Sequence, residues 1–302
     1  MMPGDIRQGL AMTLSEFLLH SGRTILLDGA MGTQLADAGL EMGGRTNLTH
    51  PDAVRAIHEQ YSACGVDLIT TNTLTMNRIN IESHELGVDL GEVNLAGAAL
   101  ARAAAREGQY VLGDIGPTGK MLKPHGPLSG EEAYEAFREH ASILAEAGVD
   151  GFIIETMIAL PEAVLAVRAC LEAADLPVIA SMTFTTLKRG GRTVMGDAAA
   201  DCARALTEAG ASAVGANCGT IDPVEMAEIV SHMRAATDRP ILAEPNAGRP
   251  AFVEGRTVFT MSPSDFAHGV RLCIEAGARM VGGCCGTTPA HIRAIGLASR
   301  TE

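Results

Sequence analysis

Short apolar runs recur along the chain, and each breaks into small or polar residues at its carboxyl-terminal end. Amphipathic patterns typical of helices fill most of the gaps, and a glycine often ends the helix before the next run. A buried strand that alternates with a helix eight times predicts a (β/α)8 TIM barrel, an α/β fold. The eight runs are residues 24–32, 64–73, 110–119, 147–156, 177–185, 209–218, 240–248 and 276–285. The clearest helical patterns are residues 51–63, 91–107, 130–147, 161–174 and 222–236.

The domain organisation follows from the length of this pattern. No proline- and serine-rich linker or low-complexity segment divides the 302 residues, and a barrel of this kind takes roughly 250 residues. We therefore expect one domain over residues 1–302, with the barrel at about 24–299 and a short N-terminal helical extension outside it.

Composition and charge exclude several classes of protein. The net charge of −13, without a run of Lys or Arg, argues against a nucleic-acid partner. No apolar run reaches the roughly 20 residues that span a bilayer, and the N-terminus does not resemble a secretory signal. The seven cysteines are an odd number at uneven spacings, which argues against a disulfide framework. We expect no membrane association and a cytoplasmic location.

A barrel predicts where its chemistry lies, because active sites of this fold occupy the loops at the carboxyl ends of the strands. Polar and sulfur-containing residues collect at those ends in this sequence. They are Asp28, Gly29, Thr71, Asn72, Thr73, Asp114, Glu155, Thr156, Asn217, Cys218, Glu244, Asn246, Cys284 and Cys285.

Three cysteines stand out among these residues. Cys218 ends the sixth run, and the adjacent Cys284 and Cys285 end the eighth. Three thiolates with one open position are typical of a catalytic zinc site. Two adjacent ligands require irregular backbone, which Gly282, Gly283 and Gly286 favour. A disulfide between Cys284 and Cys285 is the alternative, but it leaves Cys218 without a role.

The charge of such a site indicates its task. Three thiolates on Zn²⁺ leave a net charge of −1, which makes bound water a poor nucleophile precursor. A substrate thiol, with a pKa of about 8.5, can lose its proton there and stay nucleophilic. The site therefore favours alkyl transfer to sulfur. The competing hypothesis is a non-catalytic zinc or thiol sensor, but a structural zinc site has four protein ligands, and no fourth Cys or His stands at a strand end.

At these residues the sequence resembles the homocysteine S-methyltransferase family. This zinc barrel occurs alone or as the homocysteine-binding module of cobalamin-dependent methionine synthase, to which the motifs are most similar. The matching stretches are DGAMGTQL (28–35), TNT (71–73), DIGPTGK (114–120), ET (155–156), GANCG (215–219), EPNAG (244–248) and GGCCGTTPAHI (282–292).

The resemblance implies a role for each matching residue. Cys218, Cys284 and Cys285 would bind zinc, and Asn246 would occupy the open position when no thiol is bound. Glu155 would pair with the α-amino group of the substrate. The amino-acid end of the substrate would be held by Asp28, Gly29, Thr71, Asn72 and Thr73.

The implied enzyme activates homocysteine, or a similar small thiol such as selenohomocysteine, as a zinc-bound thiolate and methylates it to give methionine. The corrinoid-binding motif D-x-H-x-x-G is absent from the sequence, so we expect the methyl group to come from a separate methyl-corrinoid protein. A small sulfonium donor such as S-methylmethionine is the alternative.

Overall fold

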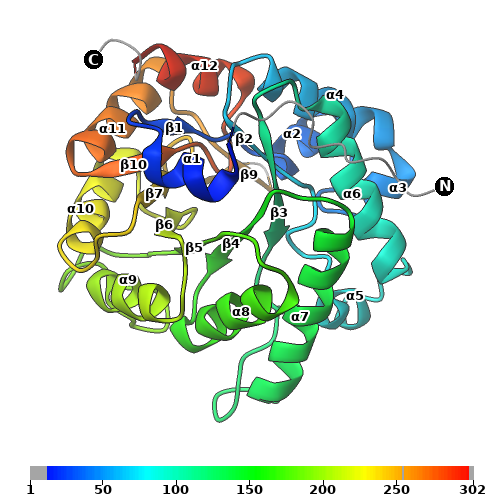
Figure 1. The fold of residues 1–302 in the computed structure, drawn as a ribbon. Helices are drawn as coiled ribbons and strands as arrows, with labels where there is room; N and C mark the ends of the chain where they lie inside the picture. The colour runs from blue at the N-terminus through cyan, green and yellow to red at the C-terminus, as the bar shows by residue number, and fades with distance from the viewer. Residues whose placement is uncertain (1–11, 254, 299–302) are drawn as a thin grey trace.

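The computed structural model describes residues 12–253 and 255–298, and it confirms the barrel (Figure 1). Eight parallel strands are hydrogen-bonded in the order β1-β10-β7-β6-β5-β4-β3-β2. The barrel closes where Leu27 bridges Leu68 and the Asp67 N–H donates to the Leu26 carbonyl at 2.7 Å. The strands are β1 (Ile25–Leu26), β2 (Leu68–Thr70), β3 (Tyr110–Ile115), β4 (Gly151–Met157), β5 (Val178–Met182), β6 (Ala213–Asn217), β7 (Ile241–Glu244) and β10 (Ala278–Val281).

Helices surround the strands, and the five helical patterns of the sequence correspond to α4, α6, α7, α8 and α10 within a few residues. Side-chain caps fix where several begin: Ser129 starts α7 and Asp222 starts α10, each in a reciprocal capping box. The helices around the barrel are α2 (Gly32–Asp37), α3 (Thr46–Thr49), α4 (Pro51–Ser62), α5 (Arg78–Ser83), α6 (Leu90–Ala104), α7 (Gly130–Glu146), α8 (Leu160–Ala173), α9 (Ala199–Glu208), α10 (Pro223–Arg234), α11 (Pro263–Glu275) and α12 (Pro289–Ala298).

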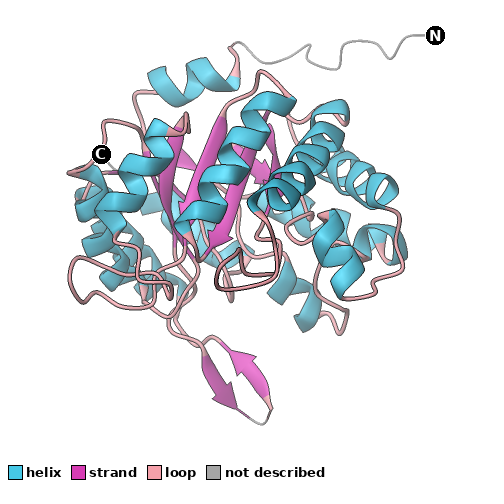
Figure 2. Cartoon of the chain, turned by 90° about the horizontal axis from the view of Figure 1, so that it is seen from below, coloured by secondary structure: helices cyan, strands magenta, loops and turns pink. Residues whose placement is uncertain are grey.

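The predicted N-terminal helix corresponds to α1 (Leu14–His20), which covers one end of the barrel (Figures 1 and 2). Its buried Leu14 and Leu18 belong to one apolar cluster with strand residues such as Leu68 and Leu112. A second and larger cluster lies between the strands and the helices. The first eleven residues of the extension lie outside the described residues.

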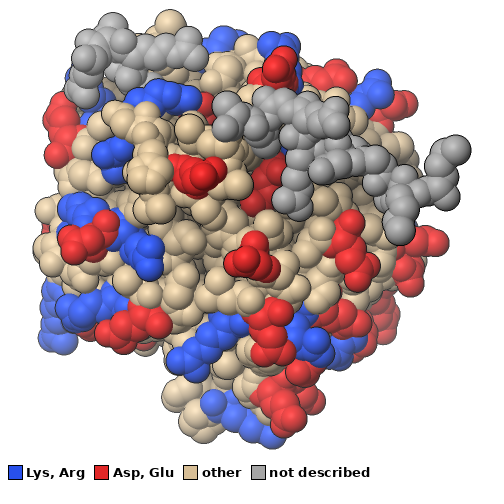
Figure 3. All heavy atoms as spheres, viewed as in Figure 1, with Lys and Arg blue, Asp and Glu red and all other residues tan. Residues whose placement is uncertain are grey.

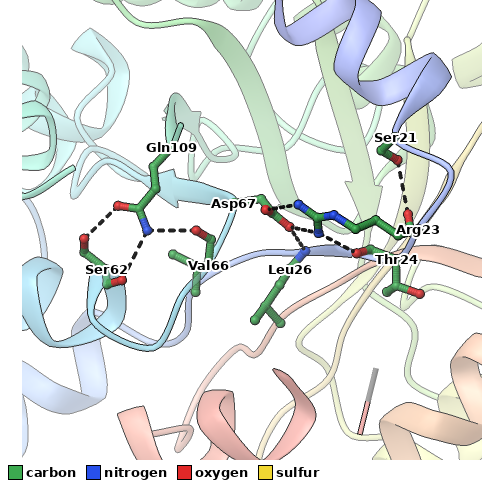
Figure 4. A network of polar contacts seen from close by, with 8 residues as sticks. All are labelled: Ser21, Arg23, Thr24, Leu26, Ser62, Val66, Asp67 and Gln109. Atoms are coloured by element: carbon green, nitrogen blue, oxygen red, sulfur yellow. Dashed lines mark hydrogen bonds and ion pairs between the residues drawn. The ribbon is translucent and has the colours of Figure 1, made fainter. Parts of the chain in front are cut away.

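A polar network ties the amino-terminal ends of β1 and β2 together beside α1 (Figure 4). The Arg23 guanidinium donates to both carboxylate oxygens of Asp67, at 2.8 and 2.6 Å, and Asp67 also accepts the Leu26 N–H at 2.9 Å. Gln109 donates to the carbonyls of Ser62 and Val66 nearby. This end of the barrel is therefore held by packing and ion pairing, and the opposite end is left for chemistry.

One element was not expected from the sequence. Strands β8 (Ala251–Val253) and β9 (Arg256–Val258) form an antiparallel hairpin between β7 and α11. The hairpin projects from the end of the barrel opposite α1 (Figure 2). Phe252 in this hairpin is 78 % exposed. The hairpin therefore lacks the apolar run by which a buried strand is recognised in the sequence.

On the face that carries α1, the described residues have positive and negative side chains interspersed (Figure 3). In the described part of the chain, no helix is both long and apolar enough to cross a bilayer. The cytoplasmic location and the single-domain organisation over residues 1–302 stay predictions.

Candidate metal centre

The three cysteines selected from the sequence converge at the carboxyl ends of two strands. Cys218 directly follows β6, and Cys284 and Cys285 lie in the turn after β10. The three sulfur atoms lie within 4.8 Å of one another, and those of Cys218 and Cys285 are 4.0 Å apart. The three cysteines line a cavity of about 330 Å³ at this end of the barrel.

The backbone around the cysteines is irregular, as adjacent ligands require. Cys218 has a φ of 58° and Gly286 a φ of 79°, both in the left-handed region. A Cβ at Gly286 would lie 2.3 Å from the Phe259 ring, so this position also needs glycine for space. The Cys284 N–H donates to the Pro245 carbonyl at 2.9 Å, which anchors the turn to the segment after β7.

The donor set fits zinc. In a tetrahedral site with Zn–S bonds of about 2.3 Å, sulfur atoms are about 3.8 Å apart, close to the 4.0 Å between Cys218 and Cys285. Among the described residues, this group of cysteines has no fourth His, Cys, Asp or Glu as a further ligand. Three sulfur ligands facing a cavity are typical of a catalytic site with an open position, and not of a closed structural site.

The thiols already interact in this arrangement. Hydrogen bonds from Cys284 and Cys285 lower the pKa of Cys218 to about 3. The hydrogen bond to Cys218 raises the pKa of Cys285 to about 12, and contacts with Cys218 and Cys285 raise that of Cys284. A single thiolate shared by two thiols is a cluster that a cation would stabilise further.

Four carboxyl groups line the same cavity, and no Lys, Arg or His is among its described lining residues. They are Asp28 after β1, Asp114 in β3, Glu155 in β4 and Glu244 at the end of β7. Asp28 accepts the Thr70 N–H at 3.0 Å, and Glu155 accepts a side-chain N–H of Asn217 at 2.5 Å. One oxygen of Asp114 and one of Glu244 are buried without a hydrogen-bond partner.

Burial is the main reason why these carboxyls are hard to ionise together. It raises the pKa of Asp28 to about 7 and, with the charges of Cys218 and Asp28, that of Glu155 to about 8. The pKa values of Asp114 and Glu244 are raised well above the ordinary range by burial and by neighbouring carboxylates. Such a cavity attracts a cationic group, because a cation would relieve this repulsion.

The turn at residues 71–73 divides its side chains between the cavity and the protein interior. Thr71 and Asn72 line the cavity together with Gly29. The Asn72 amide donates to Asn47 at 2.9 Å, toward α3. Thr73 is fully buried and donates to the Asp114 carbonyl at 2.8 Å, so it supports the site without lining the cavity.

Asn246 follows β7 and contacts the segment of Cys218. Its amide nitrogen donates to the Gly219 carbonyl at 2.9 Å, and the side chain also hydrogen-bonds to Cys218. Its side-chain oxygen is buried without a partner. An oxygen of this kind beside a sulfur cluster is suited to a metal, and its role as a ligand stays a prediction.

Several residues of the site received no role from the sequence. Asp114, Glu244 and Asn217 stand at strand ends within the motif stretches, which was the available signal. Met42 and Gly43 also line the cavity, but they lie in a loop between short helices and no pattern marked them.

Comparison with known proteins shows the family of this chain. The model of the family described as homocysteine S-methyltransferase matches residues 25–298. Two curated relatives named methionine synthase, from Mycobacterium leprae (strain TN) and Mycobacterium tuberculosis (strain ATCC 25618 / H37Rv), are 32 % identical over 297 and 303 residues. These alignments cover 91 % and 92 % of this chain but 24 % and 25 % of the relatives, so the chain spans about a quarter of their length.

A solved structure with a similar fold is the homocysteine methyltransferase MmuM from Escherichia coli in its metallated form. It has a TM-score of 0.76 and 23 % identity, and the match covers 93 % of this chain and 98 % of that one. This likeness supports the barrel fold. Because the family match extends over nearly all of the barrel and includes the three cysteines, the chain belongs to the homocysteine S-methyltransferase family.

Proposed function

We propose that the protein transfers a methyl group to the sulfur of homocysteine, giving methionine, with zinc held by Cys218, Cys284 and Cys285. The observation that carries this proposal is the convergence of three sulfur atoms in a cavity whose charged groups are otherwise carboxyls. Zinc, when bound, would supply the positive charge that keeps the substrate sulfur deprotonated near neutral pH. Other residues of the cavity would hold the amino-acid part of homocysteine beside the zinc.

Recognition of the amino-acid end follows from the charges in the cavity. Glu155 pairs with the α-ammonium, and Asp28 adds a second carboxyl on the wall of the cavity. Gly29 and the turn at residues 71–73 hold the amino-acid end. A cavity without a described basic side chain leaves backbone N–H groups and hydroxyl groups, such as those of Thr33 and Thr75, to receive the substrate carboxylate.

The variant Glu155→Gln tests this assignment. It keeps the shape of the side chain but removes the charge, so we expect homocysteine to bind about 10-fold more weakly or worse, the scale of a charge-assisted hydrogen bond. Zinc content should stay at one ion per chain. Isothermal titration of the zinc-loaded protein with homocysteine measures the affinity, and metal analysis measures the zinc content. Unchanged homocysteine affinity would show that Glu155 is structural.

A methyl-corrinoid protein is the donor we propose. The three lysines of the chain, Lys120, Lys123 and Lys188, all lie in loops at the carboxyl ends of β3 and β5. Exposed apolar side chains lie in the same loops, with Met121 at 44 % and Val194 at 61 % exposure. Charged and apolar side chains in these two loops at the rim of the barrel suit docking of a partner protein.

The alternative donor is a small sulfonium compound such as S-methylmethionine. The four carboxyls of the cavity favour it, because a sulfonium carries a positive charge at the reacting centre. The remaining alternative, a non-catalytic sensor, needs a closed zinc site, and the described residues offer three ligands and an adjoining cavity instead.

A further inference from the structure

Asn217 connects the cysteine cluster with the carboxyl group of Glu155. It is the last residue of β6, directly before Cys218, and its side chain is fully buried. Its amide nitrogen lies 2.5 Å from a carboxylate oxygen of Glu155 and 2.9 Å from the hydroxyl of Thr156. The same nitrogen is 3.8 Å from the sulfur of Cys284.

The orientation of this amide is fixed by its other partners. The side-chain oxygen of Asn217 accepts the Thr156 N–H at 2.8 Å and the Ser181 hydroxyl at 2.7 Å. If the amide were reversed, its oxygen would face the carboxylate of Glu155 and its N–H groups would face the Thr156 N–H. Ser181 and Thr156 therefore force Asn217 to present its donor to Glu155.

The backbone next to Glu155 needs this support. Thr156 has a φ of 60°, in the left-handed region, which is unfavourable for a β-branched residue. Asn217 makes two hydrogen bonds with Thr156: its side-chain oxygen accepts the backbone N–H of Thr156, and its side-chain nitrogen donates to the Thr156 hydroxyl. Strain that is held in place by surrounding contacts is typical of functional sites, and here it turns Glu155 toward the cavity.

We infer that Asn217 is a positioning residue that fixes the Glu155 carboxylate where it receives the α-ammonium of the substrate. The inference rests on the proposed function, because it takes Glu155 as the ammonium partner. Asn217 donates to one oxygen of Glu155, and Glu155 also hydrogen-bonds to Asp114, so these contacts hold the carboxylate on the wall of the cavity. The contact with Glu155 at 2.5 Å is much closer than that with Cys284 at 3.8 Å, so Asn217 acts on ammonium recognition before it acts on the metal ligands.

The test compares two ligands on the zinc-loaded protein. Homocysteine carries the ammonium, and 4-mercaptobutanoate is the same molecule without the amino group. In Asn217→Asp the Glu155 carboxylate loses its donor and faces a second carboxylate. We expect the Kd for homocysteine to rise about 10- to 100-fold, the effect of losing a hydrogen bond to a charged group, and the Kd for 4-mercaptobutanoate to stay within about 3-fold. Zinc content should stay at one ion per chain.

Other outcomes would overturn the inference. Equal weakening of both ligands, or loss of zinc, would mean that Asn217 acts through the cysteine cluster. Unchanged binding of both would mean that the amide is only part of the fold. A double variant with Glu155→Gln should bind homocysteine no more weakly than the weaker single variant, because both changes remove one interaction.

Two further variants keep the test valid if Asn217→Asp does not fold. Ser181→Ala removes one of the two donors that orient the amide, and we expect homocysteine to bind about 3-fold more weakly with 4-mercaptobutanoate unaffected. Thr183→Val is the matched control: the Thr183 hydroxyl donates to the backbone carbonyl of Asn217 at 3.1 Å and not to its amide, so the ratio of the two affinities should not change. A Ser181→Ala protein with the parental ratio would contradict the inference.

The proposed function fails separately from this inference. If the parent protein binds homocysteine no better than 4-mercaptobutanoate, the ammonium site itself is wrong. If Glu155→Gln removes the preference for homocysteine but Asn217→Asp keeps it, only the positioning role of Asn217 is wrong.

Discussion

The sulfur atoms of Cys218 and Cys285 lie 4.0 Å apart although 67 residues separate them in the sequence. Parallel strands of a barrel all end at the same rim, so residues that follow β6 and β10 meet there across β7. The spacing is that of two ligands on one tetrahedral ion.

Replacing Cys218 by Ala should abolish zinc binding and methyl transfer, and the barrel should stay folded because the ligand lies beyond the strand. Bound zinc after dialysis, measured by atomic emission, should fall from one per chain to below about 0.1, since one of three ligands is lost. Far-UV circular dichroism checks the fold. The matched control is Cys64→Ser: Cys64 is half-buried, and its thiol contacts the Gln60 and Pro289 carbonyls and not the cluster. Full zinc in Cys218→Ala would refute the assignment.

The fold could be predicted because its signals are local and repeated. Each buried strand is an apolar run, and each exit from a strand carries small or polar residues, so the eightfold pattern and the rim position of Cys218 could be inferred together. The hairpin around Phe252 could not, because an exposed pair of strands buries no face and leaves no apolar pattern.

The orientation of the side chains could not be predicted from the sequence. Asp114 and Asn217 were visible at strand ends, but their roles depend on contacts with β4 and its left-handed Thr156. A non-glycine residue adopts that conformation only when distant groups hold it. Thr73 shows the converse: its neighbours in the motif line the cavity, but the turn directs its hydroxyl to Asp114.

The methyl donor can be identified by a direct comparison. With zinc-loaded protein and homocysteine, we expect methylcobalamin to support methionine formation, and S-methylmethionine to do so at least about 10-fold more slowly at equal concentration, a difference of about 1.4 kcal/mol in activation free energy. Chromatography of methionine measures both rates. Efficient reaction with S-methylmethionine and none with methylcobalamin would refute the corrinoid partner and leave the cysteine site intact.

Buried histidines should make the protein sensitive to acid. Burial lowers the pKa of His58 to about 4 and that of His140 to about 3. Between the ordinary value of 6.5 and these values the unfolded chain binds protons that the folded chain does not, so the contribution of the two histidines to the free energy of unfolding should fall as the pH drops below 6.5. The raised pKa values of the cavity carboxyls act in the opposite direction, and they are common to the parent and the variant, so the comparison of the two isolates the histidine. The Nε2–H of His140 donates to the side-chain oxygen of Asn94 at 2.9 Å, and the amide of Gln can replace that contact. Urea titrations between pH 7.5 and 4.5 should show that His140→Gln loses less free energy of unfolding than the parent protein as the pH falls. An equal pH dependence in the two proteins would show that His140 does not cause the acid sensitivity.

The ion pair that closes the barrel should contribute to stability and not to zinc binding. Asp67 binds Arg23 through both oxygens and also accepts the Leu26 N–H, and only 12 % of its side chain is exposed. Asp67→Ala leaves that N–H and the guanidinium without their partner, so we expect a loss of about 2–3 kcal/mol in the free energy of unfolding. Zinc content should stay at one per chain, because the pair lies at the α1 end of the barrel.

Arg55→Ala is the control. The Arg55–Glu59 pair is about half exposed on both sides, so its loss should change the free energy of unfolding by less than about 0.5 kcal/mol. Equal midpoints of urea unfolding for the two variants would show that the closure of β1 on β2 does not depend on this pair.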